Sequence, residues 1–396
     1  MQINPFSLAR LPRIEFGKGR LDTLPDIIRQ YGNRVLLVTG SASIEKTPYW
    51  ETTLDKLRKA SCSWQQVRIP REPSPDMVDS IVSDHKNGQF DVVVGFGGGS
   101  TLDAAKAIAG LLLIDHSVMD FLEGVGPELP YPGPSVPFIA VPTTAGTGSE
   151  ATKNAVLSQT GRNGFKKSFR DDRLVAEYAI VDPDLLASCP PSLIAANGMD
   201  ALTQIMESFV STKSNTMTDS LAIGGLRACR DGLLDWYSGK GDQETAREAM
   251  AYASLISGIC LAQTGLGSVH GLASPLGAFF PIPHGVVCGT LLACATRINI
   301  EAMLQREKNN PALQKYKRLA VILCNRKFAD DNEAFASLVQ LLTDWTNTMK
   351  LEKLSSYGVS ADDHAHITQH SRGSSMKTNP IVLTDIEIIN ILDERT

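Results

Sequence analysis

An aspartate and two histidines in the second half of the chain are residue types that bind metal ions. Asp200 and Gln204 are four residues apart and share one face of a predicted helix. His270 and His284 both lie in apolar surroundings punctuated by glycine or proline, and His284 precedes an apolar helix whose dipole opposes its protonation. One carboxylate and two imidazoles can hold a divalent ion such as Fe²⁺ or Zn²⁺. The residues alone leave a second interpretation open, in which both histidines are hydrogen-bonded core residues.

A glycine-rich stretch in the first half separates a β-branched run from an alanine-rich run, which predicts a strand, a turn and a helix. The backbone N–H groups of Gly97, Gly98 and Gly99 can approach a ligand closely, and the helix start adds partial positive charge. Ser100 and Asp103 are expected to form a capping box. This pattern favours phosphate or pyrophosphate binding. The alternative is a tight turn that needs glycine only for positive φ.

A second loop of small and hydroxyl residues, 142–150, follows the predicted strand 138–141. Hydroxyl-rich turns at the carboxyl ends of strands cap helices or hydrogen-bond ligands. Two such loops in one sheet suggest a dinucleotide that spans both.

The elements that position these residues change character along the chain. Up to about residue 185, short β-branched runs alternate with helical patterns, which indicates βαβ units and a largely parallel sheet. Beyond that point apolar residues recur every three or four positions, which is typical of helices. We therefore predict an α/β domain at 1–185 and an all-helical domain at 186–396, with the ligand in the cleft between them.

Composition restricts the class of protein. The 396 residues are 43% hydrophobic and 20% charged, as in a soluble globular protein, and the net charge of −5 offers no footprint for nucleic acid. The N-terminal residues lack a leader pattern, and the apolar runs are too short to cross a membrane, so a cytoplasmic location is expected. The seven cysteines are scattered and odd in number, which predicts reduced, mostly buried thiols.

Taken together, the motifs resemble the iron-containing (group III) alcohol dehydrogenase family over nearly the whole chain. The resemblance is carried by residues 97–106, 142–150, 179–183, 198–203, 270–273, 282–285 and 378–380. It implies a Rossmann-like N-terminal domain and an all-helical C-terminal domain, the dehydroquinate synthase-like fold. It also implies NAD or NADP, a divalent metal, a small alcohol or aldehyde as substrate, and a homodimer.

The resemblance also implies roles for individual residues. By analogy, the pyrophosphate is held by Gly97, Gly98, Gly99 and Ser100, the nucleotide is lined by Thr143, Thr144 and Thr147, and the nicotinamide or its ribose is flanked by Asp103 and Lys166. The resemblance further implies that Asp200, His270 and His284 are the catalytic metal ligands, with Gln204 in the fourth place, where the family pattern has histidine. The amide oxygen of Gln204 is a weaker donor than imidazole. A second departure is Ser274, where relatives often carry another histidine that could relay a proton.

The turn after the strand 35–39 bears on cofactor choice. NAD-preferring relatives often place an aspartate there, whereas this chain has Gly40 and Ser41, which can accept a 2′-phosphate. NADP is therefore allowed, although the turn can equally be unselective.

The predicted function is hydride transfer between a nicotinamide cofactor and a small primary alcohol or aldehyde, assisted by a divalent metal acting as a Lewis acid. Two alternatives remain at this stage. One is a lyase resembling dehydroquinate synthase, which uses NAD only transiently. The other is a metal-free reductase of the same family, suggested by Gln204 and Ser274.

Overall fold

The computed structural model describes residue 3 and residues 5–396, and these form two compact units. The α/β unit comprises Ala9–Gln159 and Lys166–Cys189. The helical unit comprises Pro190–Thr396 with Thr160–Phe165 and the described residues up to Leu8. Residues 1, 2 and 4, which are part of the N-terminal segment predicted to lack a leader, lie outside the described residues.

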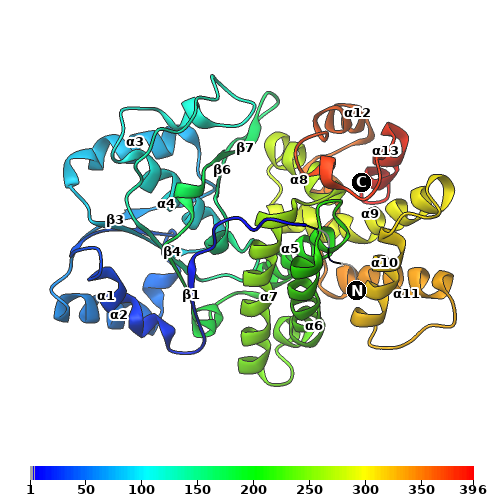
Figure 1. Cartoon of the computed structure of the whole chain (residues 1–396), viewed down its shortest axis with the longest axis horizontal. Helices are drawn as coiled ribbons and strands as arrows, with labels where there is room; N and C mark the ends of the chain where they lie inside the picture. The colour runs from blue at the N-terminus through cyan, green and yellow to red at the C-terminus, as the bar shows by residue number, and fades with distance from the viewer. Residues whose placement is uncertain (1–2, 4) are drawn as a thin grey trace. The chain divides into compact units, whose positions relative to one another are not determined.

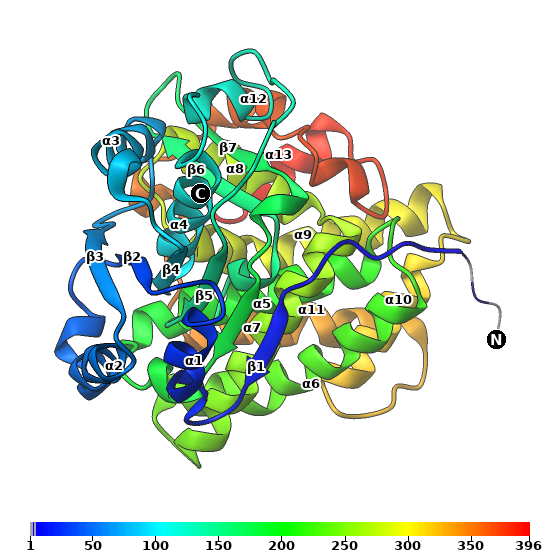
Figure 2. The ribbon, with the colours of Figure 1, turned by 60° about the vertical axis from the view of Figure 1, so that its left-hand side comes forward.

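A six-stranded parallel sheet forms the centre of the α/β unit. In spatial order its strands are β1 (Arg13–Phe16), β8 (Tyr178–Val181), β5 (Phe138–Pro142), β4 (Val92–Gly97), β2 (Arg34–Thr39) and β3 (Ser63–Arg68). Figure 2 shows β3 at one edge and β1 at the other. The inner strands β2, β4 and β5 are buried along almost their whole length, as Val- and Ile-rich parallel strands are. The predicted parallel α/β architecture is confirmed.

The strand order and register bring three turns together at the carboxyl ends of the strands. The chain runs from β2 to β3 on one side and then returns to the other side of β2 as β4, so the order reverses between β2 and β4. In such sheets ligands bind outside the carboxyl ends of the strands at the reversal. The register pairs Thr39 with Phe96 and Gly97 with Pro142, so the three strands end together. The turns that follow β2, β4 and β5 therefore lie side by side at the carboxyl ends of these strands.

Four helices and a hairpin complete the α/β unit (Figure 1). They are α1 (Leu24–Ile28), α2 (Pro48–Lys59), α3 (Pro75–His85), α4 (Gly99–Leu111), and the two-stranded sheet of β6 (Asn154–Gln159) and β7 (Phe165–Arg170). Small alanines let α4 pack closely both on the sheet and on β6, and most of the helix is buried. The strands β1, β6 and β7 were not anticipated from the sequence.

The helical unit contains nine α-helices within the described residues. They are α5 (Pro191–Val210), α6 (Thr216–Ser238), α7 (Gln243–Thr264), α8 (Ser268–Phe279), α9 (His284–Arg306), α10 (Ala312–Leu323), α11 (Asp331–Thr348), α12 (Ala361–His370) and α13 (Asp385–Asp393). The predicted helical second half is thus confirmed. The almost wholly buried α5 packs against α6, α7 and α9, and α8 packs against α9 (Figure 1).

Among the residues that the structure describes, one helix, α9, is long and apolar enough by composition to cross a membrane. The pair α7 and α8 meets the same criterion together but is bent by 99°. In α9, 83% of the apolar window is buried inside the protein, which is typical of a core helix. Its apolar surface is therefore used in packing the helical unit.

Candidate functional site

Asp200 lies in the middle of α5 with only 1% of its surface exposed. Neither carboxylate oxygen makes a hydrogen bond, although Oδ1 lies 3.3 Å from Nε2 of His270 and 3.7 Å from Nε2 of His284. Burial alone raises the pKa of Asp200, but the imidazoles of His284 and His270 outweigh it and hold the pKa below its usual value. A buried carboxylate without hydrogen bonds is unfavourable unless a cation compensates its charge. Asp200 therefore has the environment of a metal ligand.

His270 is held in the first turn of α8 by a second buried acid, Glu207 of α5. The Nδ1–H of His270 donates to Oε2 of Glu207 at 2.7 Å, and the backbone N–H of Val269 donates to Oε1 at 2.7 Å. A carboxylate partner on Nδ1 leaves the lone pair of Nε2 facing Asp200. Burial lowers the pKa of His270, but contacts with Cys288, Asp200 and Glu207 raise it overall well above its usual value.

His284 and Cys288 bring a third and a fourth group from α9. They are one helical turn apart, so both side chains face the same side of the helix. Sγ of Cys288 lies 3.6 Å from Nε2 of His270 and 3.7 Å from Nε2 of His284. Burial raises the pKa of the Cys288 thiol to about 12. The ligand atoms of Asp200, His270, His284 and Cys288 all lie within 4.8 Å of one another, and we call these four residues the donor cluster.

The donor cluster contains three of the four residues predicted as ligands and one that was not predicted. Gln204 is buried on α5 one turn beyond Asp200, and its ligand role stays a prediction. Cys288 was predicted only to be one of the reduced, mostly buried thiols, although its spacing of four residues from His284 was a usable signal. Glu207 was also missed. Its signal was a spacing of seven from Asp200, two turns along the same helix face.

The glycine-rich turn lies where β4 passes into α4. Strand β4 ends at Gly97, Gly98 is the N-cap, and α4 begins at Gly99. None of these glycines has a positive φ, so the tight-turn interpretation does not account for them. They are needed for close approach: a Cβ on Gly99 would lie 2.7 Å from Oγ1 of Thr147, and one on Gly98 would lie 3.2 Å from the side chain of Thr144.

The expected capping box is wrong. Ser100 is the second residue of α4 and is exposed, and the N-cap Gly98 has no side chain to offer. Asp103 is engaged elsewhere, because its Oδ1 accepts the hydroxyl of Ser149 at 2.5 Å. The N-terminus of α4 has no side-chain cap, and its N–H groups ahead of Thr101, which donates to the Gly98 carbonyl, can serve an anionic ligand.

A buried lysine connects the second loop to α4. The ammonium of Lys106 donates to the Oγ of Ser149 at 2.8 Å, to Oγ1 of Thr152 at 2.9 Å and to the carbonyl of Asn154 at 2.7 Å. Burial raises the pKa of Asp103 and lowers that of Lys106, while their mutual attraction opposes both shifts. This network holds the loop with Thr143, Thr144 and Thr147 beside the glycine turn.

The remaining predicted cofactor residues lie in different places. A Cβ on Gly40 would lie 3.5 Å from Oγ1 of Thr101, so Gly40 adjoins the first turn of α4, and Ser41 follows it on the surface. Lys166 lies in β7, where its Nζ makes hydrogen bonds of 2.8 and 3.0 Å to the carboxylate of Glu72. The role of Lys166 beside the nicotinamide stays a prediction.

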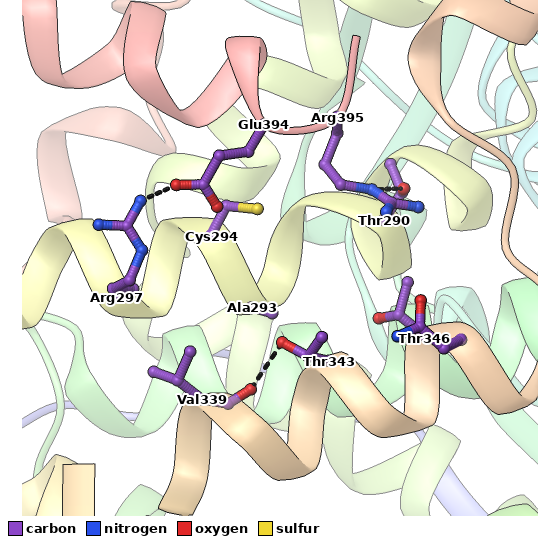
Figure 3. Close-up of a pocket in the computed structure, with 10 residues that line it drawn as sticks. Thr290, Ala293, Cys294, Arg297, Val339, Thr343, Thr346, Glu394 and Arg395 are labelled. Carbon is purple, nitrogen blue, oxygen red and sulfur yellow. Dashed lines mark hydrogen bonds and ion pairs between the residues drawn. The ribbon is translucent and has the colours of Figure 1, made fainter. Parts of the chain in front are cut away.

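A cavity of about 190 Å³ lies between α9, α11 and the C-terminal residues (Figure 3). Both of its arginines already have partners: Arg297 pairs with Glu394, and Arg395 donates to Oγ1 of Thr290 at 2.7 Å. The carboxylate of Glu394 compensates the charge of Arg297, whereas the guanidinium of Arg395 is held by the neutral oxygens of Thr290 and Leu351. The donor cluster does not line it.

Comparisons with known proteins agree on one family. Residues 12–183 match the sequence model of the iron-containing alcohol dehydrogenases, and residues 194–396 match the model of the C-terminal part of the Fe-containing alcohol dehydrogenase family. Alcohol dehydrogenase 4 of Saccharomyces cerevisiae is 30% identical over 95% of both chains. An NADPH-dependent butanol dehydrogenase of Clostridium saccharobutylicum is 31% identical over 75% of both chains. A crystal structure of sulfoacetaldehyde reductase from Bifidobacterium kashiwanohense with NAD⁺ superimposes with a TM-score of 0.83, 27% identity and 99% coverage of both chains.

Proposed function

The chain belongs to the iron-containing alcohol dehydrogenase family, and from this premise we propose that it interconverts a small primary alcohol and its aldehyde by hydride transfer with NAD or NADP. The observation that carries the proposal is the convergence of Asp200, His270 and His284 on one point. Relatives named for NADPH and solved with NAD⁺ support either cofactor.

The α/β unit binds the dinucleotide. Its pyrophosphate lies against the uncapped N-terminus of α4, where the bare backbone of Gly98 and Gly99 admits it and the helix dipole attracts it. Gly40 and Ser41 receive the ribose at the neighbouring strand end, and their lack of negative charge admits a 2′-phosphate.

The helical unit binds the substrate oxygen. Asp200, His270 and His284 would hold a divalent ion, which when bound supplies Lewis-acid stabilisation of negative charge on that oxygen. Glu207 keeps the Nε2 lone pair of His270 directed into the cluster. During reduction the carbonyl carbon accepts hydride from the nicotinamide and the oxygen accepts one proton. The hydroxyl of Ser274 or water delivers that proton in place of the histidine found in relatives.

The expected setting is a cytoplasmic homodimer whose partners are small molecules rather than nucleic acid or a membrane. The net charge of −5 argues against nucleic acid as a partner, and the burial of α9 argues against a membrane. The dimer is proposed from the family resemblance alone. Light scattering on a sizing column measures the subunit number, and a monomer would contradict the dimer.

A carbonyl screen tests the proposed function. Purified protein is given short aldehydes with NADH or NADPH, with and without added Zn²⁺ or Fe²⁺, and loss of reduced cofactor is followed. Net consumption is expected, and His270→Ala should lower kcat/KM about a hundredfold or more, because a Lewis acid contributes several kcal/mol. His366→Ala, a histidine on the exposed side of α12, is the control.

Two outcomes would redirect the proposal. No net consumption of cofactor with any aldehyde or alcohol favours the lyase alternative, which uses NAD only transiently. Full turnover after removal of metal by a chelator favours the metal-free reductase. This second candidate is supported by Gln204, which stands where the family pattern has a ligating histidine.

A further inference from the structure

We propose that Cys288, and not Gln204, is the fourth ligand of the metal, so that the ion is held by one thiolate, two imidazoles and one carboxylate and is zinc in preference to iron. This inference rests on the proposed function only in requiring a metal at Asp200, His270 and His284. Two observations support it. The Cys288 sulfur lies close to both imidazoles, and the buried carboxylate of Asp200 has no hydrogen bond.

The distances match the edges of a small coordination tetrahedron. Bonds of about 2.0–2.1 Å to nitrogen or oxygen and about 2.3 Å to sulfur, at tetrahedral angles, separate neighbouring ligand atoms by about 3.3–3.6 Å. The Cys288 sulfur lies 3.6 and 3.7 Å from the two Nε2 atoms, and Oδ1 of Asp200 lies 3.3 and 3.7 Å from the same atoms. Four edges of the cluster therefore have nearly the lengths that a shared ion requires.

The fold holds Cys288 in this position through the contact of α9 with α5. Gly289, the next residue of α9, leaves room for this approach, since a Cβ there would lie 2.7 Å from Cβ of Met199. The hydroxyl of Thr346 on α11 donates to the Gly289 carbonyl at 3.2 Å, which ties α9 to α11 at the same turn. Cys288 is thus directed at Asp200 by backbone packing around it and does not depend on a flexible side chain.

Charge and donor type favour Cys288 over Gln204. A thiolate carries a negative charge and attracts a divalent ion more strongly than the neutral amide oxygen of Gln204 does. On binding, the thiol releases one proton to solvent and its sulfur forms the bond to the metal. Sulfur is a soft donor, and sites that mix cysteine with histidine suit zinc, so the exchange of donors shifts selectivity away from iron(II).

Other cysteines of the helical unit provide a comparison within the same chain. Cys294 lies on the same helix six residues further on, and its side chain points into the cavity lined by Arg297 and Arg395 (Figure 3). It is buried like Cys288 but is absent from the donor cluster. Cys294 is therefore the matched control for a lost buried thiol.

X-ray absorption at the zinc edge tests the ligand set without relying on activity. Metal-depleted protein is loaded with one equivalent of zinc, and one sulfur scatterer is expected at about 2.3 Å. Cys288→Ser should lose this scatterer, while Gln204→Ala and Cys294→Ser should keep it. Bound zinc with only nitrogen and oxygen neighbours in the wild-type protein would overturn the proposal, and this measurement remains decisive if Cys288→Ser fails to fold.

A rescue experiment tests the exchange of donors. In Cys288→Ala the metal affinity should fall, and adding Gln204→His should restore it, because residue 204 lies one turn from Asp200 on the same helix face. Loading from an anaerobic mixture of Zn²⁺ and Fe²⁺ should fill the wild-type protein mainly with zinc and move the double variant toward iron. Equal zinc occupancy in wild type and Cys288→Ala would overturn the proposal.

The two proposals fail separately. A sulfur-bound zinc in a protein that reduces no carbonyl compound leaves the ligand set standing and removes the function. A reductase that takes up no metal removes the ligand set and leaves the metal-free form of the function.

Discussion

The Nδ1–H of His270 donates to Oε2 of Glu207 at 2.7 Å, and this contact joins the first turn of α8 to α5. The same carboxylate accepts the backbone N–H of Val269, so one buried acid both orients the imidazole and caps the helix that carries it. The direction of Nε2 therefore depends on a residue outside the donor cluster.

Replacing Glu207 should weaken metal binding more than folding. Partners of ligating histidines typically contribute about 10- to 100-fold in metal affinity, so a loss of this size is expected for Glu207→Ala in zinc titrations. Glu207→Gln should lose less, because its amide oxygen can still accept one hydrogen bond. Wild-type zinc affinity in a folded Glu207→Ala protein would show that His270 is oriented by other contacts.

Metal depletion should lower the melting temperature. An ion that binds only the folded chain stabilises it by about 2.7 kcal/mol at 100 times its dissociation constant. Scanning calorimetry of chelated and zinc-reloaded protein should show a reversible rise on reloading, and Asp200→Asn should abolish the rise. A melting temperature that ignores added zinc at every concentration would remove the metal site.

A side chain at Gly99 should impair dinucleotide binding. The added Cβ would lie 2.7 Å from Oγ1 of Thr147, and overpacking of this kind typically costs about 1–3 kcal/mol. Weaker binding of NADH and NADPH to Gly99→Ala is expected by fluorescence titration. Gly373→Ala, where no atom lies within 4 Å of the new Cβ, is the control. Unchanged affinity in Gly99→Ala would place the pyrophosphate elsewhere.

A negative charge at Ser41 should discriminate against NADP. Ser41 is exposed just beyond β2, so Ser41→Asp would meet a 2′-phosphate with a like charge. The KM for NADPH should rise about tenfold relative to that for NADH, which corresponds to about 1.4 kcal/mol. Ser63→Asp adds the same charge at the amino end of β3, away from the carboxyl ends of the strands, and should change neither the KM for NADPH nor that for NADH. Equal effects on both cofactors would locate the ribose away from this turn.

Glu150 should make the fold less stable as pH rises. Burial raises the pKa of this carboxyl from 4.5 to about 7, although the positive charge of Lys106 opposes the shift. The folded chain thus binds more protons than the unfolded chain between these values, so stability falls through this window by about 3 kcal/mol and is fully retained below it. Urea midpoints at about pH 5 and pH 8 should converge for Glu150→Gln. An identical pH dependence in Glu150→Gln would show that other groups cause it.

The local sequence pattern was sufficient to predict those strands and helices whose formation depends on a short stretch of the chain. The β-branched run before Gly95 and the alanines after Asp103 dictate a strand and a helix with a glycine turn between them, because propensity and burial agree there. The short strand β7 was missed because its sequence is mostly polar and half-buried, with no alternation of apolar residues. The short strand β6 was missed because its burial depends on packing against α4, a contact that the local sequence does not reveal.

The amino-acid sequence by itself determined which residue types could bind a nucleotide and a metal, and in which half of the chain each set lies. Only the tertiary structure decided which side chains meet. Glu207 and His270 are 63 residues apart, and the sulfur of Cys288 reaches both imidazoles only because Gly289 lets α9 approach α5. The rotation of each helix and its distance from its neighbours are set by packing between elements, so they cannot be predicted from the periodicity of one element alone.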